Sequence, residues 1–294
     1  MTDPVPPKSV FSPASEEAET ARQATSSPQT EHPAYRLAFQ DQDFLLRQDL
    51  RPIRFQLELL KPELLLDEAN IESTFVFYGS ARIPEPDKAD ALIETAATDA
   101  QRRIAERLKA KSRYYDEARK LARIASRVAP DAQGKKQFVV CSGGGPSIME
   151  AANRGAADEG RESIGLNIVL PHEQLPNPYV TPSLSLQFHY FALRKMHFLI
   201  RARAVAVFPG GYGTFDECFE LLTLIQTGKI KPLPIMLFGR DYWNRVVNFE
   251  ALVEEGVIAP DDLDLFRFVE TAEEAWDYIC ACYADSDSGL ECAK

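Results

Sequence analysis

Short apolar runs alternate with longer amphipathic stretches from about residue 73 onward. The apolar runs are rich in Val, Ile and Phe, which is typical of strands buried on both faces of a sheet. They occupy residues 74–78, 137–141, 163–169, 204–208, 234–238 and 266–269. The stretches between them predict helices. The first helical region covers residues 87–129, with a break near 111–113. The others run from the turn at 143–145 to 160, over 190–201, from the turn at 210–214 to 227, over 242–255, and from 272 onward.

This alternation predicts one doubly wound α/β domain over residues 73–285, a Rossmann-like parallel sheet flanked by helices. Residues 1–40 hold six of the 20 prolines together with many Ser, Thr, Glu and Gln residues, and this composition predicts a disordered tail. Residues 41–72 regain a helical pattern, interrupted by two prolines, which predicts a helical lead-in that packs on the main domain or on a neighbouring subunit. Residues 286–294 are expected to form a C-terminal tail.

Composition and charge exclude several classes of protein. The 33 basic and 44 acidic side chains give a net charge of −11, which disfavours binding to nucleic-acid polymers or anionic membranes. No apolar run approaches the roughly 20 residues that span a bilayer, and the first residues lack the pattern of a secretory signal. Five cysteines without a disulfide-framework spacing predict reduced thiols and a cytoplasmic location.

Three glycine-containing turns follow predicted strands: Gly79-Ser80, Gly143-Gly144-Gly145 and Gly210-Gly211-Tyr212-Gly213-Thr214. The last two open helices, where glycine lets a ligand approach the backbone and the unpaired N–H groups attract a phosphate. The Thr214 hydroxyl adds a further hydrogen-bonding group. Neither turn has the spacing of a dinucleotide fingerprint or of a P-loop. The expected ligand is therefore a mononucleotide or a sugar phosphate.

Charged residues near these turns are candidates for catalysis. Glu217 follows Thr214 by three residues, and a carboxylate beside a phosphate site suits the stabilisation of a developing cation or the activation of water. Arg194-Lys195 is the matching cationic element, with a solvated helix face as the alternative. Glu173 follows the third strand and is expected to reach the cleft unless it is an exposed loop acid. The histidines and cysteines show no metal-binding spacing, so no metal is expected.

Several of these segments resemble the LONELY GUY (LOG) family, often labelled "lysine decarboxylase". Residues 209–217 match its P-G-G-x-G-T-x-x-E signature, and Arg194-Lys195 stands where the family has its Arg-Lys pair. Residues 77–80 resemble its first-strand Gly-Ser turn, and residues 143–150 its G-G-G-x-x-x-M segment. The resemblance covers roughly residues 73–285.

The resemblance implies a phosphoribohydrolase, which cuts the N-glycosidic bond of a nucleoside 5′-monophosphate to give free base and ribose 5-phosphate. AMP and cytokinin riboside monophosphates are the implied substrates, and the base preferred by this chain stays open. The implied catalytic pair is Glu217 and Arg194. Implied substrate-binding residues are Gly79, Ser80, Gly143, Gly144, Gly145, Glu173, Lys195, Gly210, Gly211, Tyr212, Gly213, Thr214 and Thr223. No cofactor is implied, because no lysine stands in a context suited to pyridoxal phosphate, and homodimers or larger assemblies are expected.

The chain also departs from the compact family pattern. It has an extension over residues 1–70 and an enlarged helical segment between residues 94 and 136. A non-catalytic nucleotide or molybdenum-cofactor carrier is the alternative function. Such a carrier needs the glycine-rich loops but not Glu217 together with Arg194, and the presence of both favours an enzyme.

Overall fold

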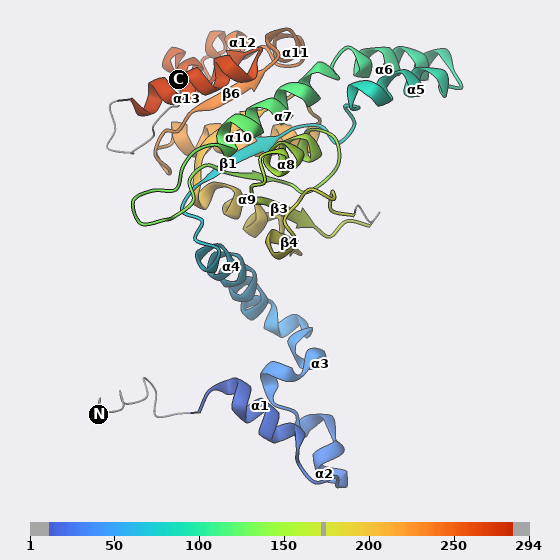
Figure 1. Ribbon diagram of the computed structural model, residues 1–294, viewed down its shortest axis with the longest axis vertical. Helices are drawn as coiled ribbons and strands as arrows, with labels where there is room; N and C mark the ends of the chain where they lie inside the picture. Colours follow the sequence, from blue (N-terminus) through green and yellow to red (C-terminus); the bar gives the residue numbers. More distant parts are fainter. Residues whose placement is uncertain (1–11, 172–174, 285–294) are drawn as a thin grey trace. The chain divides into compact units, whose positions relative to one another are not determined.

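The computed structural model describes residues 12–171 and 175–284 of the chain. Two compact units make up the chain, one up to Leu57 and one from Glu58 onward. The described part of the first unit has short helices, namely α1 (Ala14–Arg22), α2 (Pro28–Glu31), α3 (Gln42–Leu45) and the beginning of α4 (Arg51–Glu68), which are drawn in blue in Figure 1. Helix α2 starts with a reciprocal capping box between Ser27 and Thr30. Two of these helices, α1 and α2, lie within residues 1–40, where the sequence predicted a disordered tail, and of the two only α2 has a side-chain cap.

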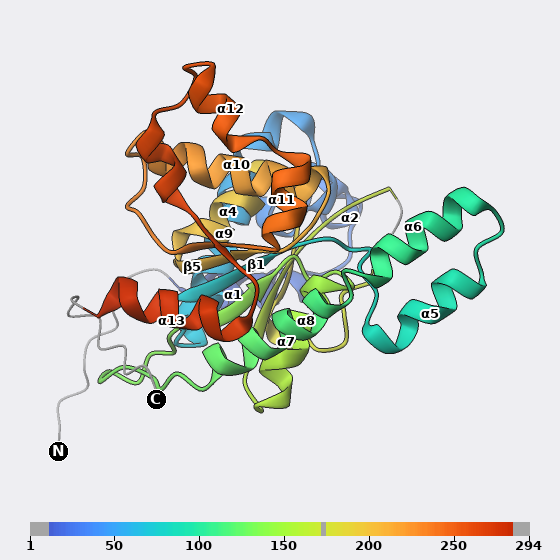
Figure 2. The ribbon, with the colours of Figure 1, turned by 90° about the horizontal axis from the view of Figure 1, so that it is seen from above.

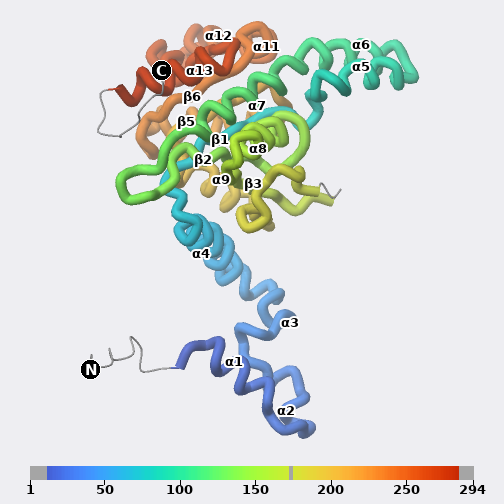
Figure 3. The backbone as a smooth tube through the Cα atoms, in the orientation of Figure 1, coloured from blue at the N-terminus to red at the C-terminus, as the bar shows by residue number. Residues whose placement is uncertain are grey.

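The second unit is built on a parallel sheet. Its strands in the described part of the chain are β1 (Thr74–Tyr78), β2 (Val139–Ser142), β3 (Ser163–Ile168), β4 (Ser185–Phe188), β5 (Ala202–Val207), β6 (Ile235–Phe238) and β7 (Arg267–Val269). They lie in the order β4-β3-β2-β1-β5-β6-β7, which Figure 3 shows from β3 to β6. The chain adds strands on one side of β1 and later on the other, so the doubly wound parallel sheet that the sequence predicted is confirmed.

Helices cover both faces of this sheet. The helices described after β1 are α5 (Pro86–Glu94), α6 (Asp99–Lys109), α7 (Arg113–Ser126), α8 (Ile148–Asp158), α9 (Phe191–Ile200), α10 (Tyr212–Gln226), α11 (Arg240–Val246), α12 (Phe249–Glu254) and α13 (Ala272–Tyr283). Of these, α5 and α6 pair with each other and project beyond the sheet (Figure 2). Helices α7, α8 and α13 share one face, where they enclose a core with Phe75 and Phe77 of β1 (Figure 2). Helices α9 and α10 lie on the other face, where Tyr78 packs edge-on against Phe198 at 5.1 Å between ring centroids. Side chains of one strand therefore alternate between two buried layers.

Helix α4 accommodates a proline in its interior. Pro62 has no N–H to give to the carbonyl of Glu58, four residues earlier, and would leave that acceptor unpaired. The Nε2 of His197 on α9 lies 3.1 Å from the Glu58 carbonyl oxygen and donates the missing hydrogen bond. The Glu58 carboxylate in turn accepts bonds from the backbone amides of His189 and Tyr190, at the start of α9. The part of α4 from Glu58 onward is thus fastened to the helix that carries Arg194.

The differences from the sequence-based elements are local. Strand β4 was not predicted, because only Leu186 and Phe188 of its four residues are buried, while Gln187 between them is exposed and Ser185 is half-buried. The helix expected over 242–255 is divided into α11 and α12, since the Asn248 side chain accepts a bond from the Ala251 amide and starts a new helix. The helical region after residue 86 has a further break between α5 and α6, where Thr98 and Gln101 form a capping box.

The described cysteines include both free thiols and a disulfide-bonded residue. Cys141 and Cys218 are free and buried, as expected of small core residues, and Cys282 is free and exposed. Cys280 is disulfide-bonded, which departs from the expectation of reduced thiols. No helix in the described part of the chain combines the length and apolar character needed to cross a membrane.

Candidate active site

A cleft of about 600 Å³ opens at the carboxyl ends of β1, β2, β3 and β5. The strand order changes direction here, because the chain leaves β1 toward β2 and later returns beside β1 as β5. Most of the predicted site residues line this cleft, namely Gly79, Ser80, Gly143, Gly145, Arg194, Gly211, Tyr212, Gly213, Thr214 and Glu217. The structure thus brings together residues that are up to 138 positions apart in the chain (79 to 217).

The start of α10 supplies a site for an anion. The helix begins at Tyr212 with Gly211 as N-cap, and no side chain of the described residues caps it. Its first amides therefore keep their N–H groups for a ligand. A Cβ atom added at Gly211 or Gly213 would meet nothing within 4 Å, so the backbone here borders open space. At Gly210 the same atom would lie 2.1 Å from Thr214 Oγ1, and this glycine lets the turn close on Thr214.

Glu217 and Arg194 form the charged centre of the cleft. The Nη1 of Arg194 donates to Oε1 of Glu217 at 3.2 Å, and its Nε donates to the Leu166 carbonyl oxygen at 2.7 Å. The two side chains are only 10% and 13% exposed. Burial raises the pKa of Glu217 to about 7, although the Arg194 charge acts in the opposite direction. A carboxyl group poised near neutrality in a cleft is suited to proton transfer.

The triple-glycine turn is shaped by these neighbours. A Cβ at Gly143 would lie 2.6 Å from Nη2 of Arg194, so glycine leaves room for the guanidinium. Gly144 has a positive φ of 73°, which a glycine adopts without strain. Its carbonyl oxygen accepts a bond from Asn177 Nδ2 at 3.1 Å, and the Gly145 carbonyl accepts another at 3.0 Å. Asn177 is buried and was missed by the sequence analysis, because nothing in its local pattern distinguishes it from a loop asparagine.

Asn167 is a second residue of the site that the sequence analysis missed. It lies near the end of β3 and lines the cleft beside Arg194. A signal was present in the sequence, since Asn167 is the one amide side chain within the apolar run 163–169. A polar residue at the carboxyl end of a buried parallel strand points to a ligand rather than to the core.

Other predicted residues do not line the cleft. The Nζ of Lys195 pairs with Asp216 and with Glu220, each at 3.0 Å, on the outer side of α9 and α10. Thr223 is exposed, and its hydroxyl donates to the Phe219 carbonyl within α10. Gly144 packs against Asn167 and Gly210 packs against Thr214, and both of these partners line the cleft. Glu173 lies outside the described residues.

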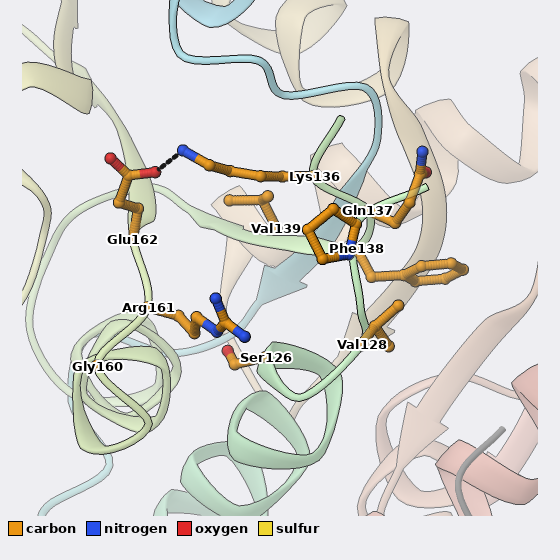
Figure 4. A pocket seen from close by; sticks show the side chains of 10 residues that line it. Ser126, Val128, Lys136, Gln137, Phe138, Val139, Gly160, Arg161 and Glu162 are labelled. Atoms are coloured by element: carbon orange, nitrogen blue, oxygen red, sulfur yellow. Dashed lines mark hydrogen bonds and ion pairs between the residues drawn. The ribbon is translucent and has the colours of Figure 1, made fainter. Parts of the chain in front are cut away.

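A second cavity, of about 330 Å³, lies at the opposite edge of the sheet, at the amino ends of β2 and β3 (Figure 4). Val128, Phe138 and Val139 give it an apolar wall, and Lys136 and Glu162 form an ion pair at its margin. None of the described residues that were predicted for the site lines this cavity. In residues 12–171 and 175–284, no group of three or more His, Cys, Asp or Glu side chains is placed to hold a metal ion.

The fold and the cleft define a Rossmann-type α/β protein with an anion site at a helix start and a buried Glu–Arg pair beside it. Residues 149–279 match the family model described as "Possible lysine decarboxylase". The cytokinin riboside 5′-monophosphate phosphoribohydrolase LOG3 of Arabidopsis thaliana is 30% identical over 140 residues, which cover 46% of this chain and 63% of that protein. A probable enzyme of the same name, LOGL3 of Oryza sativa subsp. japonica, is 29% identical over 150 residues, 48% of this chain and 67% of that protein. These matches show that part of the chain is similar in sequence to the LOG proteins.

The similarity to these relatives is partial. The chain spans 63% of the length of LOG3, and the matched residues make up less than half of this chain. Among solved structures, the molybdenum cofactor carrier protein of Chlamydomonas reinhardtii aligns with a TM-score of 0.38 and 15% identity over 72% of this chain and 98% of that chain. A likeness of this degree carries no conclusion about function.

Proposed function

We propose that the protein hydrolyses the N-glycosidic bond of nucleoside 5′-monophosphates, AMP or cytokinin riboside 5′-monophosphates, to free base and ribose 5-phosphate. One observation carries the proposal: the buried carboxyl group of Glu217 faces the same cleft as the free amides of α10 and lies 3.2 Å from Arg194. A protein that only holds a phosphate gains nothing from a buried carboxylate beside it. The names of the LOG relatives support the same reaction.

The geometry suggests a role for each group. The amides of Gly213 and Thr214 at the start of α10 hold the 5′-phosphate and fix the ribose in the cleft. As the bond from C1′ to the base nitrogen breaks, positive charge develops on the ribose ring. Ionised Glu217 stabilises this charge and takes a proton from the attacking water, whose oxygen joins C1′. The bonding electrons leave with the base, and the proton that Glu217 took from the water passes through solvent to the base nitrogen, so that one water is added across the bond.

Arg194 has a positioning role in this scheme. It is anchored to the Leu166 carbonyl and lies over the Phe198 ring at 4.9 Å, so it holds Glu217 in one orientation. Its remaining N–H groups are available to ribose hydroxyls or to the phosphate. Binding energy at these remote groups then fixes the geometry at C1′.

Replacing Glu217 tests the proposal. Glu217→Gln keeps the size of the side chain but removes its charge, and we expect kcat for ribose 5-phosphate release from AMP to fall about 100- to 1000-fold. Asp216→Asn is the matched control, because Asp216 pairs with Lys195 outside the cleft and its loss leaves turnover close to that of the unaltered protein. Unchanged turnover in Glu217→Gln would refute the proposed reaction. Tight binding of AMP without any turnover in the unaltered protein would instead favour the carrier.

We also propose that the protein forms homo-oligomers. Three large apolar side chains of α9, Phe191, Met196 and Ile200, are between 42% and 54% exposed. Exposed apolar groups of this size on one helix are typical of surfaces that are covered in an assembly. Light scattering on the purified protein measures the mass that decides this point.

A further inference from the structure

The amide group of Asn167 is held in one orientation. Its Nδ2 donates to the carbonyl oxygens of Gly165 and Leu186 at 3.2 and 3.1 Å and lies 3.3 Å from Ser185 Oγ. The opposite orientation would place the side-chain oxygen against two carbonyl oxygens, which repel it. The neighbouring strands β3 and β4 therefore determine which end of the amide is turned away from them.

The other end, Oδ1, is an acceptor without a protein donor. Among the described residues no donor to it is found, and the side-chain hydrogen bonds of Asn167 are all made by Nδ2. It lies against Gly144, where an added Cβ would be only 2.3 Å away, so the glycine preserves the space around this oxygen. Asn167 belongs to the wall of the cleft. An acceptor fixed in such a wall calls for a donor from the ligand, because leaving it unpaired on binding costs free energy.

The position of Asn167 shows which part of a nucleotide it meets. The phosphate site follows β5 and Asn167 ends β3, and three strand spacings of about 4.8 Å each separate these strands. Arg194 spans the interval, since it contacts Leu166, the neighbour of Asn167, and also Glu217. A nucleotide with its phosphate on α10 and its C1′ beside Glu217 therefore directs its base toward β3.

We propose that Asn167 determines base specificity, by accepting a hydrogen bond from an amino N–H of the substrate base. The inference rests on the function proposed above and identifies the substrate class: nucleoside monophosphates whose base carries an amino group, adenine first. An oxo group at the same place, as in hypoxanthine, sets an acceptor against an acceptor and is disfavoured. An adenine with a single substituent on its amino nitrogen keeps one N–H and remains acceptable.

A series of substrates tests this assignment on the full-length protein. We expect kcat/KM to decrease from AMP to purine riboside 5′-monophosphate, which has no group at this position, and to be lowest for IMP. In Asn167→Leu, which is similar in size but has no acceptor, the AMP to IMP ratio is expected to fall about ten- to a hundredfold, with AMP and purine riboside monophosphate hydrolysed at similar rates. Gln187→Leu on β4 is the control, because Gln187 is exposed and does not line the cleft.

Three results would overturn the inference. Equal kcat/KM for AMP and IMP in the unaltered protein overturns the inference, even if Asn167→Leu fails to fold. An unchanged AMP to IMP ratio in a folded Asn167→Leu variant also does so. A variant that changes the ratio of AMP to 2′-deoxy-AMP instead shows that Asn167 contacts the ribose and not the base. In these cases the hydrolytic function stands, whereas absence of hydrolysis with every nucleotide removes both proposals.

Discussion

Among single residues, Glu217 is the one whose charge state matters most for the proposed reaction. Burial disfavours its ionised form and raises its pKa to about 7, and Arg194 keeps the pKa from rising further. A carboxyl group on the protein surface is ionised at every physiological pH. Glu217 changes its charge in the range where the protein is expected to work, and activity must follow that change.

The pH dependence of hydrolysis is therefore predictable in sign. Below pH 7 Glu217 is protonated and can neither stabilise a cation nor accept a proton from water, so we expect kcat/KM for AMP to rise as the pH increases through about 7 and to level off above it. A pH profile of kcat/KM measures this. Asp216→Asn should keep the rising limb but move it to lower pH, because the Asp216 charge contributes to the raised pKa of Glu217, whereas Glu217→Gln should lose the rising limb. Activity that falls over the same interval would assign Glu217 the role of an acid instead.

Among the predicted site residues, those whose position depends on a local constraint line the cleft. The signature at 209–217 contains the turn, the helix start and the carboxylate within nine positions, so its geometry follows from one strand-to-helix connection. Lys195 failed to reach the cleft because adjacent residues on a helix point in different directions, and Arg194 occupies the inward one. Asn167 was missed because its role depends on β4, a strand that the pattern did not reveal.

At the scale of elements, the connection between β2 and α8 is stabilised by hydrogen bonds from a residue elsewhere in the chain. Asn177, far along the chain, donates through Nδ2 to the carbonyls of Gly144 and Gly145 and to Asn153 Oδ1 at 2.9 Å. Asn153 also receives a bond from Ser142 Oγ at 2.7 Å, at the end of β2. This buried network fixes a turn that has no regular secondary structure of its own.

Removal of Asn177 should affect both stability and the cleft. Asn177→Ala leaves the Gly145 carbonyl without its donor and removes one of the two bonds to the Gly144 carbonyl and to Asn153 Oδ1. We expect it to lower the free energy of unfolding by about 1–3 kcal/mol and to raise KM for AMP more than it lowers kcat. Urea denaturation and steady-state kinetics measure the two effects. Asn244→Ala in α11 is the control, because Asn244 is exposed and its replacement should change neither quantity. A neutral Asn177→Ala would mean that the turn holds its shape unaided.

Element boundaries were predictable from the sequence where apolar periodicity or a capping residue marks them. The strands β1, β5 and β6 have a neighbouring strand on each side and contain apolar runs, which begin after Thr74 in β1 and after Arg203 in β5. The edge strand β4 alternates buried and exposed residues over only four positions, which is too short to distinguish from a loop. Helix α4 continues through Pro62 because His197 satisfies the carbonyl that the proline leaves open, a tertiary contact that no local pattern contains.

For the molecule as a whole, the main hydrophobic core lies in the second unit. Every residue of the main hydrophobic core lies between Phe75 and Ile279. Helix α4 adds ionic contacts, since Arg201 pairs with Glu63 at 2.9 Å and with Asp67 at 2.8 Å. No described residue of the first unit belongs to that core, and the residues that line the cleft belong to the second unit.

A truncated chain tests this independence. We expect residues 51–294, which retain all of α4, to fold and to hydrolyse AMP at close to the full-length rate. Circular dichroism during heating and the ribose 5-phosphate assay measure this. A chain that starts at residue 73 is the comparison, and it should melt at a lower temperature because α9 loses Glu58 at its amino end and Arg201 loses both carboxylates. Inactivity of the longer truncated chain would give the first unit a part in the reaction.

Strand β4 lies at the edge of the sheet, yet it supplies Leu186 and Ser185 to the amide of Asn167. The edge of a sheet is the part that frays first when a protein is warmed or mildly denatured. Glu217 belongs to α10, beside the central strands, and keeps its surroundings for longer. We therefore expect selectivity and turnover to have different thermal thresholds: on warming, the ratio of kcat/KM for AMP to that for IMP should fall before the release of ribose 5-phosphate does.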